Sequence, residues 1–495
     1  MPGVMYKNRN LRGGQAMLII VLLTTVFLSL AAMSVDFVFA YVVKSRLVMA
    51  VDAAALGAVR NIGQGTSRMN KNIELLFKAN FPDDFMLATG SSYNPPIVTT
   101  PSAGVRQIEI SAETILPTFF MRILGYENLT LRASAKAARR DVNMMLVVDR
   151  SASLHPNNAD AWDDVQEAAN FFVSQFDDDR DQVGLVTFGT NAQVDVAMAT
   201  NFQTTITNAM NSQIVPNSAS TNAPQGLWLG YGELLAEADP NPLNVIIFFT
   251  DGQPSSYTAT FPVRTAAYPG NDSVPYCGSS PQEAVIGAFQ SGADFYEIAG
   301  FWNPQADGPP ITTGSSGGST YDHFVKAGCD SPNNTFTPWA SRTEWLFNPS
   351  SCLPSSWTAG YSPPSGGSIS KTFSITSGPY SVNQCHSWLH STSTNWSVRN
   401  FRGTQVHNAS KNLAIAIAEN ARQNSALGDV RVYSIGLGGW GYPADAEFLQ
   451  RVSNDPDSPT YSDSEPTGLY AYAPTPMQLR QAFQSVANEI FRLVL

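Results

Sequence analysis

The sequence predicts an α/β fold, a doubly wound and mostly parallel sheet with helices on both faces. The main observation is that short, uninterrupted apolar runs, typical of buried parallel strands, alternate with segments of helical periodicity. A long uncharged apolar segment near the N-terminus predicts a transmembrane and stalk helix ahead of this sheet. Residues 255–405 break the alternation, and a stretch of that length far exceeds ordinary α/β connections. We therefore expect a large, loop-rich insertion within the domain.

Composition limits the possible functions. A chain of 495 residues is too long for one compact core and indicates two or three domains. Charged residues make up only 14%, and 29 basic residues against 40 acidic ones give a net charge of −11. An acidic chain without a long basic stripe argues against nucleic acid as a partner.

The apolar segment Met17–Val35 contains no charged residue and is long enough to cross a bilayer as a helix. Lys7, Arg9 and Arg12 precede it, and this positive charge predicts that the N-terminus is cytoplasmic. We expect a single-pass protein of the cytoplasmic membrane, with the bulk of the chain periplasmic or extracellular. The alternative is a cleaved signal peptide, for which Ser29–Ala31 offers small residues, but the apolar run is long for a signal core and continues beyond them.

Asp36 interrupts the apolar character just beyond this segment. A carboxylate there either has a specific partner or marks the level at which the helix leaves the bilayer. Residues 42–61 keep a helical pattern with many alanines, so we expect the helix to continue as a stalk with Asp52 near its middle.

This region resembles the N-terminal segment of TadG-like proteins of the Tad/Flp (tight adherence) pilus-assembly system. The similarity lies in Gly14 before the membrane helix, Asp36 at its outer end, and the Ala-rich stretch Leu47–Gly57. Residues 115–142 also resemble the family's link between the stalk and a larger domain. The resemblance implies partners among pilins or other pilus-assembly proteins.

The elements of the α/β domain follow in order along the chain. Strands are expected at residues 143–148, 182–188, 244–249 and 430–435, and helices at 161–176, 227–235 and 409–423. A last helix is expected from Thr475, with Thr475 as its N-cap, Pro476 at the first position and Gln478 at N3. The apolar face of this helix, which we expect to cover the sheet, is Leu479, Phe483, Val486 and Ile490.

Polar residues gather where these strands end. Asp149, Ser151 and Ser153 follow the first strand, Thr221 lies in a loop before a helix, and Asp251 follows another strand. Ligands of such sheets bind at the carboxyl ends of the strands. Two carboxylates and three hydroxyls form an all-oxygen set that suits Mg²⁺ or Mn²⁺. Because hydroxyls are neutral, the cation would stay under-neutralised and attract a carboxylate from a protein partner at its open position.

The set resembles the metal-ion-dependent adhesion site, or MIDAS, of von Willebrand factor A (vWA) domains. The resemblance implies that the three hydroxyls bind the metal and that the two carboxylates act directly or through water. Two residues depart from the family pattern: Ala152 replaces a usual Gly, and Arg150 could pair with an Asp and lower the metal affinity.

The insertion differs in composition from the rest of the chain. Residues 255–405 hold only 14 charged residues and six of the nine tryptophans. All four cysteines also lie there, and an even number outside the cytoplasm favours two disulfides with three possible connectivities: Cys277, Cys329, Cys352 and Cys385. Zinc binding by Cys385, His386 and His390 is a weaker alternative. The insertion is either a surface module that contacts sugars, proteins or a solid surface, or an elaboration that packs against the sheet.

No HExxH or P-loop motif is present, so we expect no enzymatic activity. The preferred hypothesis is metal-dependent adhesion or protein–protein interaction in pilus assembly or surface attachment. The alternative is a structural, pilin-like or envelope-assembly component whose vWA domain is a passive scaffold. The expected parts are a cytoplasmic N-terminus, a transmembrane helix, a stalk and linker, a first vWA part, the insertion and a second vWA part: residues 1–15, 16–43, 44–142, 143–254, 255–405 and 406–495.

Overall fold

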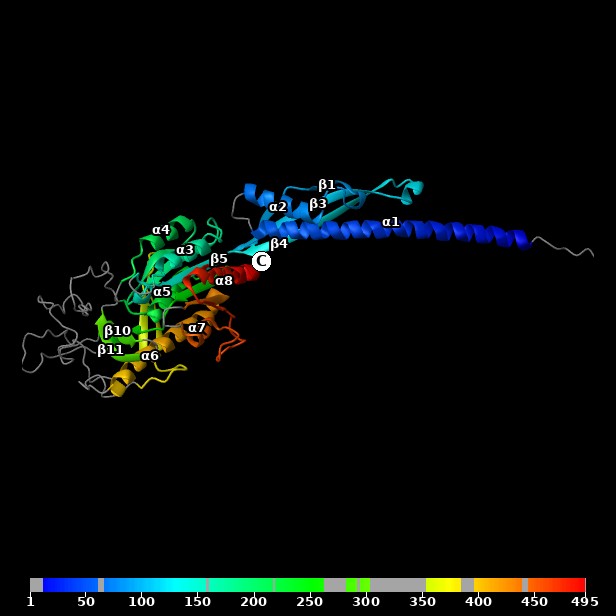
Figure 1. The fold of residues 1–495 in the computed structure, drawn as a ribbon. Helices are drawn as coiled ribbons and strands as arrows, with labels where there is room; N and C mark the ends of the chain where they lie inside the picture. Colours follow the sequence, from blue (N-terminus) through cyan, green and yellow to red (C-terminus); the bar gives the residue numbers. More distant parts are fainter. Residues whose placement is uncertain are drawn as a thin grey trace, which may run out of the picture. The chain divides into compact units, whose positions relative to one another are not determined.

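The protein forms two compact units in a computed structural model (Figure 1). The first comprises the chain up to Arg139 and the second Arg140–Val494. The structure describes residues 12–60, 66–156, 160–216, 219–261, 282–291, 294–302, 353–383, 396–438 and 444–494. The domain bounds expected from the sequence remain predictions.

One helix, α1 (Arg12–Arg60), dominates the first unit. Its apolar part from Met17 to Val35 is exposed, apart from intermediate burial at residues 32 and 33. Within the described part of the chain, α1 is the one helix that is long and apolar enough to cross a membrane. The helix continues unbroken beyond Asp36, as the Ala-rich sequence predicts.

Beyond residue 40, α1 becomes the core of a small folded unit (Figure 1). It packs against α2 (Thr66–Asn80) and against a sheet in which β3 pairs with β1, β2 and β4. The strands are β1 (Thr89–Tyr93), β2 (Ile97–Ser102), β3 (Val105–Pro117) and β4 (Asn128–Arg140). Small residues permit this packing, since a Cβ added at Gly57 would collide with Leu76 Cδ1. The predicted stalk is therefore buried between a helix and a sheet.

The second unit contains a six-stranded sheet in the order β15-β14-β8-β5-β6-β7. All neighbours are parallel except β6 and β7, which form an antiparallel edge. The strands are β5 (Val142–Asp149), β6 (Gln182–Phe188), β7 (Ala192–Ala199), β8 (Leu243–Thr250), β14 (Val430–Leu437) and β15 (Tyr470–Ala473). The predicted mostly parallel sheet is confirmed.

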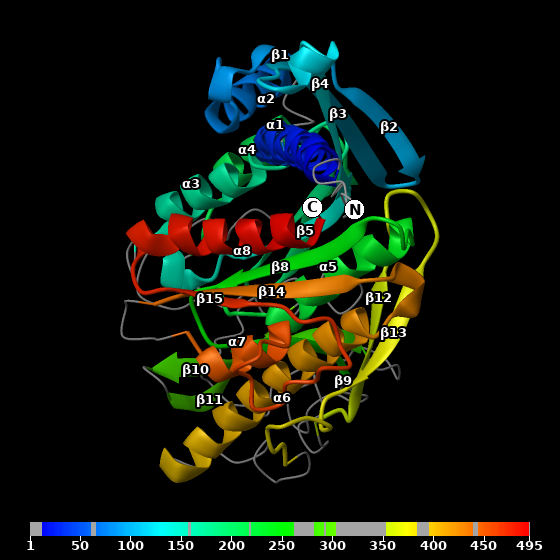
Figure 2. The same cartoon turned by 90° about the vertical axis from the view of Figure 1, so that its right-hand side faces the viewer.

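Helices cover both faces of this sheet (Figure 2). One face packs against α3 (Trp162–Val173), α4 (Gln203–Ser212) and α8 (Leu479–Val494), and the other against α5 (Ala223–Glu237), α6 (Trp396–Arg422) and α7 (Ala446–Ser453). Successive side chains of β5 point to opposite faces of the sheet, so β5 contributes to both hydrophobic cores. Leu146 faces the first set of helices and Val147 faces the second. The doubly wound fold that the sequence predicts is therefore observed.

The C-terminal helix differs in detail from the prediction. Its predicted apolar face is buried, but its first turn is a 3₁₀ segment, Pro476–Gln478. The Gln478 N–H already donates to the Thr475 carbonyl at 3.0 Å. Thr475 is the N-cap and Pro476 follows it at the first position, as predicted, and Thr475 Oγ1 bonds the Gln478 side chain at 2.9 Å rather than a backbone amide.

The described parts of the insertion contain more regular structure than the sequence predicts. β9 (Ser256–Phe261), β10 (Gln282–Ser291) and β11 (Asp294–Trp302) form an antiparallel sheet, and β12 (Ser356–Tyr361) pairs with β13 (Ile369–Ser374). α6 begins at Trp396, 13 residues before the predicted start at 409. Polar residues hide this first part of the helix in the sequence, although Val406 is fully buried.

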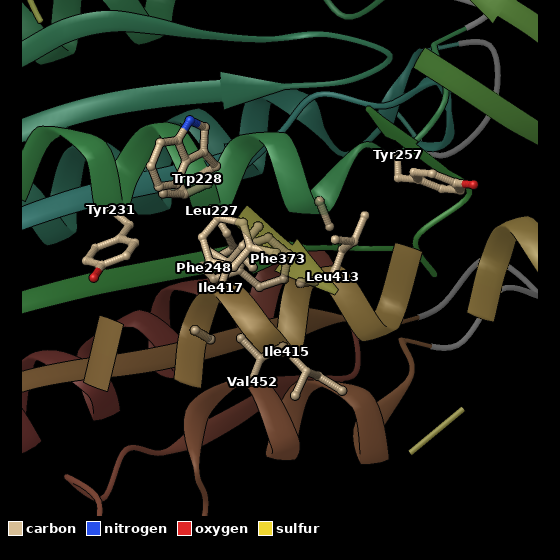
Figure 3. Packing of buried hydrophobic residues seen from close by; sticks show 14 of the residues in the cluster. Leu227, Trp228, Tyr231, Phe248, Tyr257, Phe373, Leu413, Ile415, Ile417 and Val452 are labelled. Atoms are coloured by element: carbon tan, nitrogen blue, oxygen red, sulfur yellow. The ribbon is translucent and has the colours of Figure 1, made fainter. Parts of the chain in front are cut away.

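These insertion strands join the core that covers one face of the six-stranded sheet (Figure 3). Trp228 of α5 stacks edge-on against Phe373 of β13, with ring centroids 5.5 Å apart, and its Nε1 donates to the Gly360 carbonyl at 2.9 Å. Contacts with α5 and α6 position these strands, so the described part of the insertion packs mainly on the helices rather than directly on the sheet. The four cysteines, His386 and His390 lie outside the described residues.

Candidate metal centre

The predicted site lies at the carboxyl ends of two adjacent parallel strands. Asp149 is the last residue of β5, and Asp251 directly follows β8. The pairing of Val148 with Phe249 places Asp149 beside Thr250 at the same edge. The topology therefore brings together two carboxylates that lie far apart in the sequence.

Hydrogen bonds connect four of the five predicted residues. Ser151 N donates to Asp149 Oδ1 at 2.7 Å, and Ser153 Oγ donates to Asp251 Oδ1 at 2.9 Å. The Ser151 and Ser153 hydroxyl oxygens lie 3.0 Å apart, and Ser151 Oγ is 3.5 Å from Asp251 Oδ1. The loop after β5 thus positions both hydroxyls beside the carboxylate that follows β8.

Thr221 approaches the same edge from the loop before α5. Its N–H donates to Ser255 Oγ at 2.9 Å, while its carbonyl accepts from Ser255 N at 3.0 Å. A Cβ added at Gly252 would lie 3.9 Å from Thr221 Oγ1, so this hydroxyl lies next to the turn after Asp251. The buried Asn222 fixes the loop, since its amide donates to Thr190 O and to Thr258 Oγ1.

Both carboxylates are buried, with Asp149 0% and Asp251 4% exposed. Burial raises the pKa of Asp149 to about 6. Hydrogen bonds from Thr250 and Ser151 and the charge of Arg150 lower this pKa, but burial has the larger effect. Burial and then the nearby charge of Asp149 raise the pKa of Asp251 to about 8. The site therefore disfavours two ionised carboxylates unless positive charge is supplied.

The set can hold a hard cation through oxygen donors. No group of three or more His, Cys, Asp or Glu side chains suited to a metal occurs in the part of the chain that the structure describes. Any cation at this edge would consequently depend on two carboxylates and on hydroxyls. That donor chemistry fits Mg²⁺ or Mn²⁺ and does not fit zinc, which prefers nitrogen and sulfur.

Two further residues, which the sequence pattern does not mark as ligands, support the site. Thr250 Oγ1 donates to Asp149 Oδ2 at 2.5 Å, and Ser255 holds the Thr221 backbone. The signal for Thr250 was a hydroxyl at the end of an otherwise apolar strand. Ser255 lies in a loop with neighbouring serines, so the sequence does not indicate that this serine contacts Thr221.

The two departures from the vWA pattern take defined places. Arg150 N donates to Phe188 O at 2.7 Å and Ala152 N to Ala219 O at 3.1 Å, so both residues fix the loop through the backbone. Burial raises the pKa of Asp195, and the charge of Arg150 acts in the opposite direction on both Asp195 and Asp149. The charge of Arg150 thus lowers the pKa of two carboxyl groups, Asp149 and Asp195.

Two family models match the chain. The von Willebrand factor type A domain matches residues 143–270, and the Flp pilus-assembly TadE/G-like family matches residues 14–61. No curated protein matches the chain.

Solved structures to which the chain is similar include three proteins of pili. The pilus adhesin SpaC from Lactobacillus rhamnosus GG is 12% identical over 82% of this chain, with a TM-score of 0.33, and the match spans 35% of SpaC. The PilB minor pilin from Streptococcus sanguinis is 13% identical over 82% of this chain and 78% of its own length, with a TM-score of 0.37. The vWF domain of the type V pili tip protein Mfa5 from Porphyromonas gingivalis is 11% identical over 72% of this chain and 98% of its own, with a TM-score of 0.34.

The family assignment depends on the two models, which agree with the helix α1 and with the doubly wound sheet. The chain therefore joins a segment that matches the Flp pilus-assembly TadE/G-like family to one that matches the von Willebrand factor type A domain, the combination that the sequence predicts for a TadG-like protein.

Proposed function

We propose that this protein is a membrane-anchored, extracytoplasmic component of a Tad/Flp-type pilus system whose vWA domain binds a protein partner through a metal ion. The observation that supports the proposal best is the buried carboxylate pair of Asp149 and Asp251, surrounded by hydroxyls at the carboxyl edge of the sheet. A buried pair of like charges is costly, and a divalent cation would remove that cost.

Ser151, Ser153 and Thr221 would supply hydroxyl oxygens to Mg²⁺ or Mn²⁺, and the two carboxylates would act directly or through water. The bound ion would offer Lewis acidity toward an oxygen of the partner. Two carboxylates and three hydroxyls supply about five of the six oxygen ligands that an octahedral Mg²⁺ takes, so a partner carboxylate would complete the site. Pilins or other pilus-assembly proteins are the partners that the Tad/Flp family indicates.

We assign the protein to the cytoplasmic membrane, with its N-terminus inside and the vWA domain in the periplasm or outside the cell. The exposed apolar part of α1 supports the anchor, and the basic residues ahead of it support this orientation.

Calorimetric titration of the full chain in lipid nanodiscs with Mg²⁺ tests the metal site. The wild type and the control Asp163→Ala, an exposed carboxylate on α3, should bind the ion, whereas Asp149→Ala and Asp251→Ala should not. A pull-down of the purified major pilin with Mg²⁺ or with EDTA then tests the partner. If folded Asp149→Ala and Asp251→Ala variants retain the pilin equally, the metal-dependent function is wrong and the vWA domain is a passive scaffold.

A further inference from the structure

The turn between β3 and β4 in the first unit exposes a compact group of apolar side chains. We define the apolar tip as five residues with their exposed fractions: Phe119 (43%), Phe120 (41%), Ile123 (81%), Leu124 (58%) and Tyr126 (59%). A soluble surface seldom concentrates so many large apolar groups within eight consecutive residues. The apolar tip therefore needs an apolar environment or a partner.

Asp36 attaches this turn to α1. Its carboxylate accepts three backbone N–H bonds, from Phe119 at 2.8 Å, Phe120 at 2.9 Å and Met121 at 2.7 Å. The ring of Phe119 also meets Phe39 of α1 edge-on, with centroids 5.3 Å apart. The apolar tip is thus fixed at the level of residues 36–39 of the membrane helix.

The length of α1 indicates where this level lies in a membrane. The uncharged segment Met17–Val35 would span about 28 Å as a helix at 1.5 Å per residue. The hydrocarbon core of a bilayer is about 30 Å thick. Asp36 and the apolar tip consequently coincide with the boundary between acyl chains and headgroups.

The backbone of the tip suits such a boundary. Ile123 N donates to Phe120 O at 3.0 Å, Gly125 N to Arg122 O at 3.1 Å and Tyr126 N to Met121 O at 3.1 Å. Gly125 adopts a φ of +92°, which allows the tight turn. Amides that are already paired can enter a poorly hydrated layer at little cost.

We propose that the apolar tip inserts into the interfacial layer of the bilayer beside α1 and forms a second contact between the first unit and the lipid. The lipid is favoured as the occupant because the tip is continuous with the exposed apolar surface of the membrane helix through Phe39 and Asp36. Aromatic rings with a neighbouring basic residue, here Arg122, are typical of membrane interfaces. This inference depends on the anchor in the proposed function and not on the metal site.

Fluorescence quenching in vesicles of phosphatidylcholine with brominated acyl chains tests the insertion. All nine tryptophans of the chain lie at position 162 or later, so emission added by one new tryptophan is measured against the parent protein. The variants are Ile123→Trp in the tip, Leu28→Trp in the membrane helix and Thr99→Trp on exposed β2. Brominated lipid should remove more than about half of the emission added at positions 28 and 123, and little of that added at position 99.

Two results would overturn the inference. If the lipid quenches Leu28→Trp while iodide in the water quenches Ile123→Trp as strongly as Thr99→Trp, the anchor is correct and the tip does not enter the membrane. If Leu28→Trp also escapes the lipid, the anchor itself is wrong. Adding Asp36→Ala to Ile123→Trp should weaken the lipid quenching, and unchanged quenching would show that Asp36 does not position the tip.

Discussion

The two units each bury carboxylates, and they satisfy them in opposite ways. Asp36 in the first unit is 2% exposed and accepts three backbone amides. Asp149 and Asp251 in the second unit are similarly buried, but their donors are mainly hydroxyls and each raises the cost of ionising the other. A carboxylate whose partners are fixed amides is structural, whereas the buried pair favours a bound proton or cation because ionising both carboxylates is costly.

The local backbone explains this difference. The bend at residues 119–120 and the start of the 3₁₀ helix Met121–Leu124 direct three consecutive N–H groups toward the Asp36 carboxylate. At the edge of the vWA sheet, parallel strands end side by side and the loops contribute side-chain oxygens instead. Geometry thus gives the first site its full set of donors and leaves the second dependent on an added charge.

The largest expected effect is on metal binding and comes from Asp251→Asn. This variant keeps the shape of the side chain but removes one of the two like charges. Mg²⁺ affinity should fall at least about 100-fold. At a concentration of about 100 times the wild-type Kd, binding stabilises the wild type by about 2.7 kcal/mol and the variant by at most about 0.4 kcal/mol. In EDTA the order should reverse, and the Asp251→Asn variant should be the more stable protein because it buries no ionisable carboxyl group and does not repel Asp149.

Thermal unfolding with Mg²⁺ and with EDTA measures this crossover. Asp163→Asn is the matched control, since its carboxylate is exposed and lies outside the site. A variant that is less stable than the wild type under both conditions would show that Asp251 is structural in the manner of Asp36.

The next effect is a pH dependence confined to the second unit. The folded pKa values of about 6 for Asp149 and about 8 for Asp251 lie above the ordinary value of 3.8. Without metal, the folded state holds protons that the unfolded state releases, so these two groups make stability fall as the pH rises from about 4 to about 8. Mg²⁺ must displace these protons, and its affinity should rise about tenfold per pH unit between about pH 6 and 8, where one proton is displaced.

Calorimetric titrations of Mg²⁺ at about pH 6, 7 and 8 check this slope. In EDTA, the thermal stability of the Asp251→Asn protein should decrease much less with rising pH than that of the wild type. An affinity for Mg²⁺ that is flat across this range would mean that the carboxylates are already ionised before the metal binds.

A smaller effect is expected for Asp36→Ala in the first unit. Three amides would lose a charged acceptor, and a loss of about 2 kcal/mol corresponds to roughly 30-fold faster hydrogen exchange. Exchange at residues 119–121, measured by mass spectrometry in nanodiscs, reads out this change. Asp52→Ala on the same helix is the control, because Asp52 is exposed. Equal exchange in both variants would contradict the role of Asp36.

The sequence predicted the sheet well because burial on both faces leaves a clear signal. The apolar runs at residues 143–148 and 244–249 each fall within the observed strand, and the polar residues after them meet as expected. The antiparallel edge strand β7 was missed, since its residues are mostly half-buried and carry no continuous apolar run. The role of Asp36 also required the structure, because its partners are backbone amides more than 80 residues away.

The residues that hold the metal-site side chains in place could not be predicted from the sequence either. Thr250 lies beside Asp149 because β5 and β8 pair in one particular register. That register cannot be deduced from one sequence alone. The metal ligands could be proposed from residue type and position at strand ends. The residues that orient them depend on register and on loop contacts across the fold.

Thr250→Val tests this support with the smallest expected effect. Valine keeps the volume of threonine but cannot donate to Asp149 Oδ2, so the pKa of Asp149 should rise further above its ordinary value. Losing one hydrogen bond to a charged group is worth about 1.5 kcal/mol, which predicts about tenfold weaker Mg²⁺ binding by calorimetry. Thr187→Val, at a buried threonine of β6, controls for the loss of a hydroxyl within the same sheet. If both variants bind Mg²⁺ like the wild type, Asp149 needs no hydrogen-bond donor from β8 for metal binding. Only Asp251 would then differ from Asp36 in depending on hydroxyl donors.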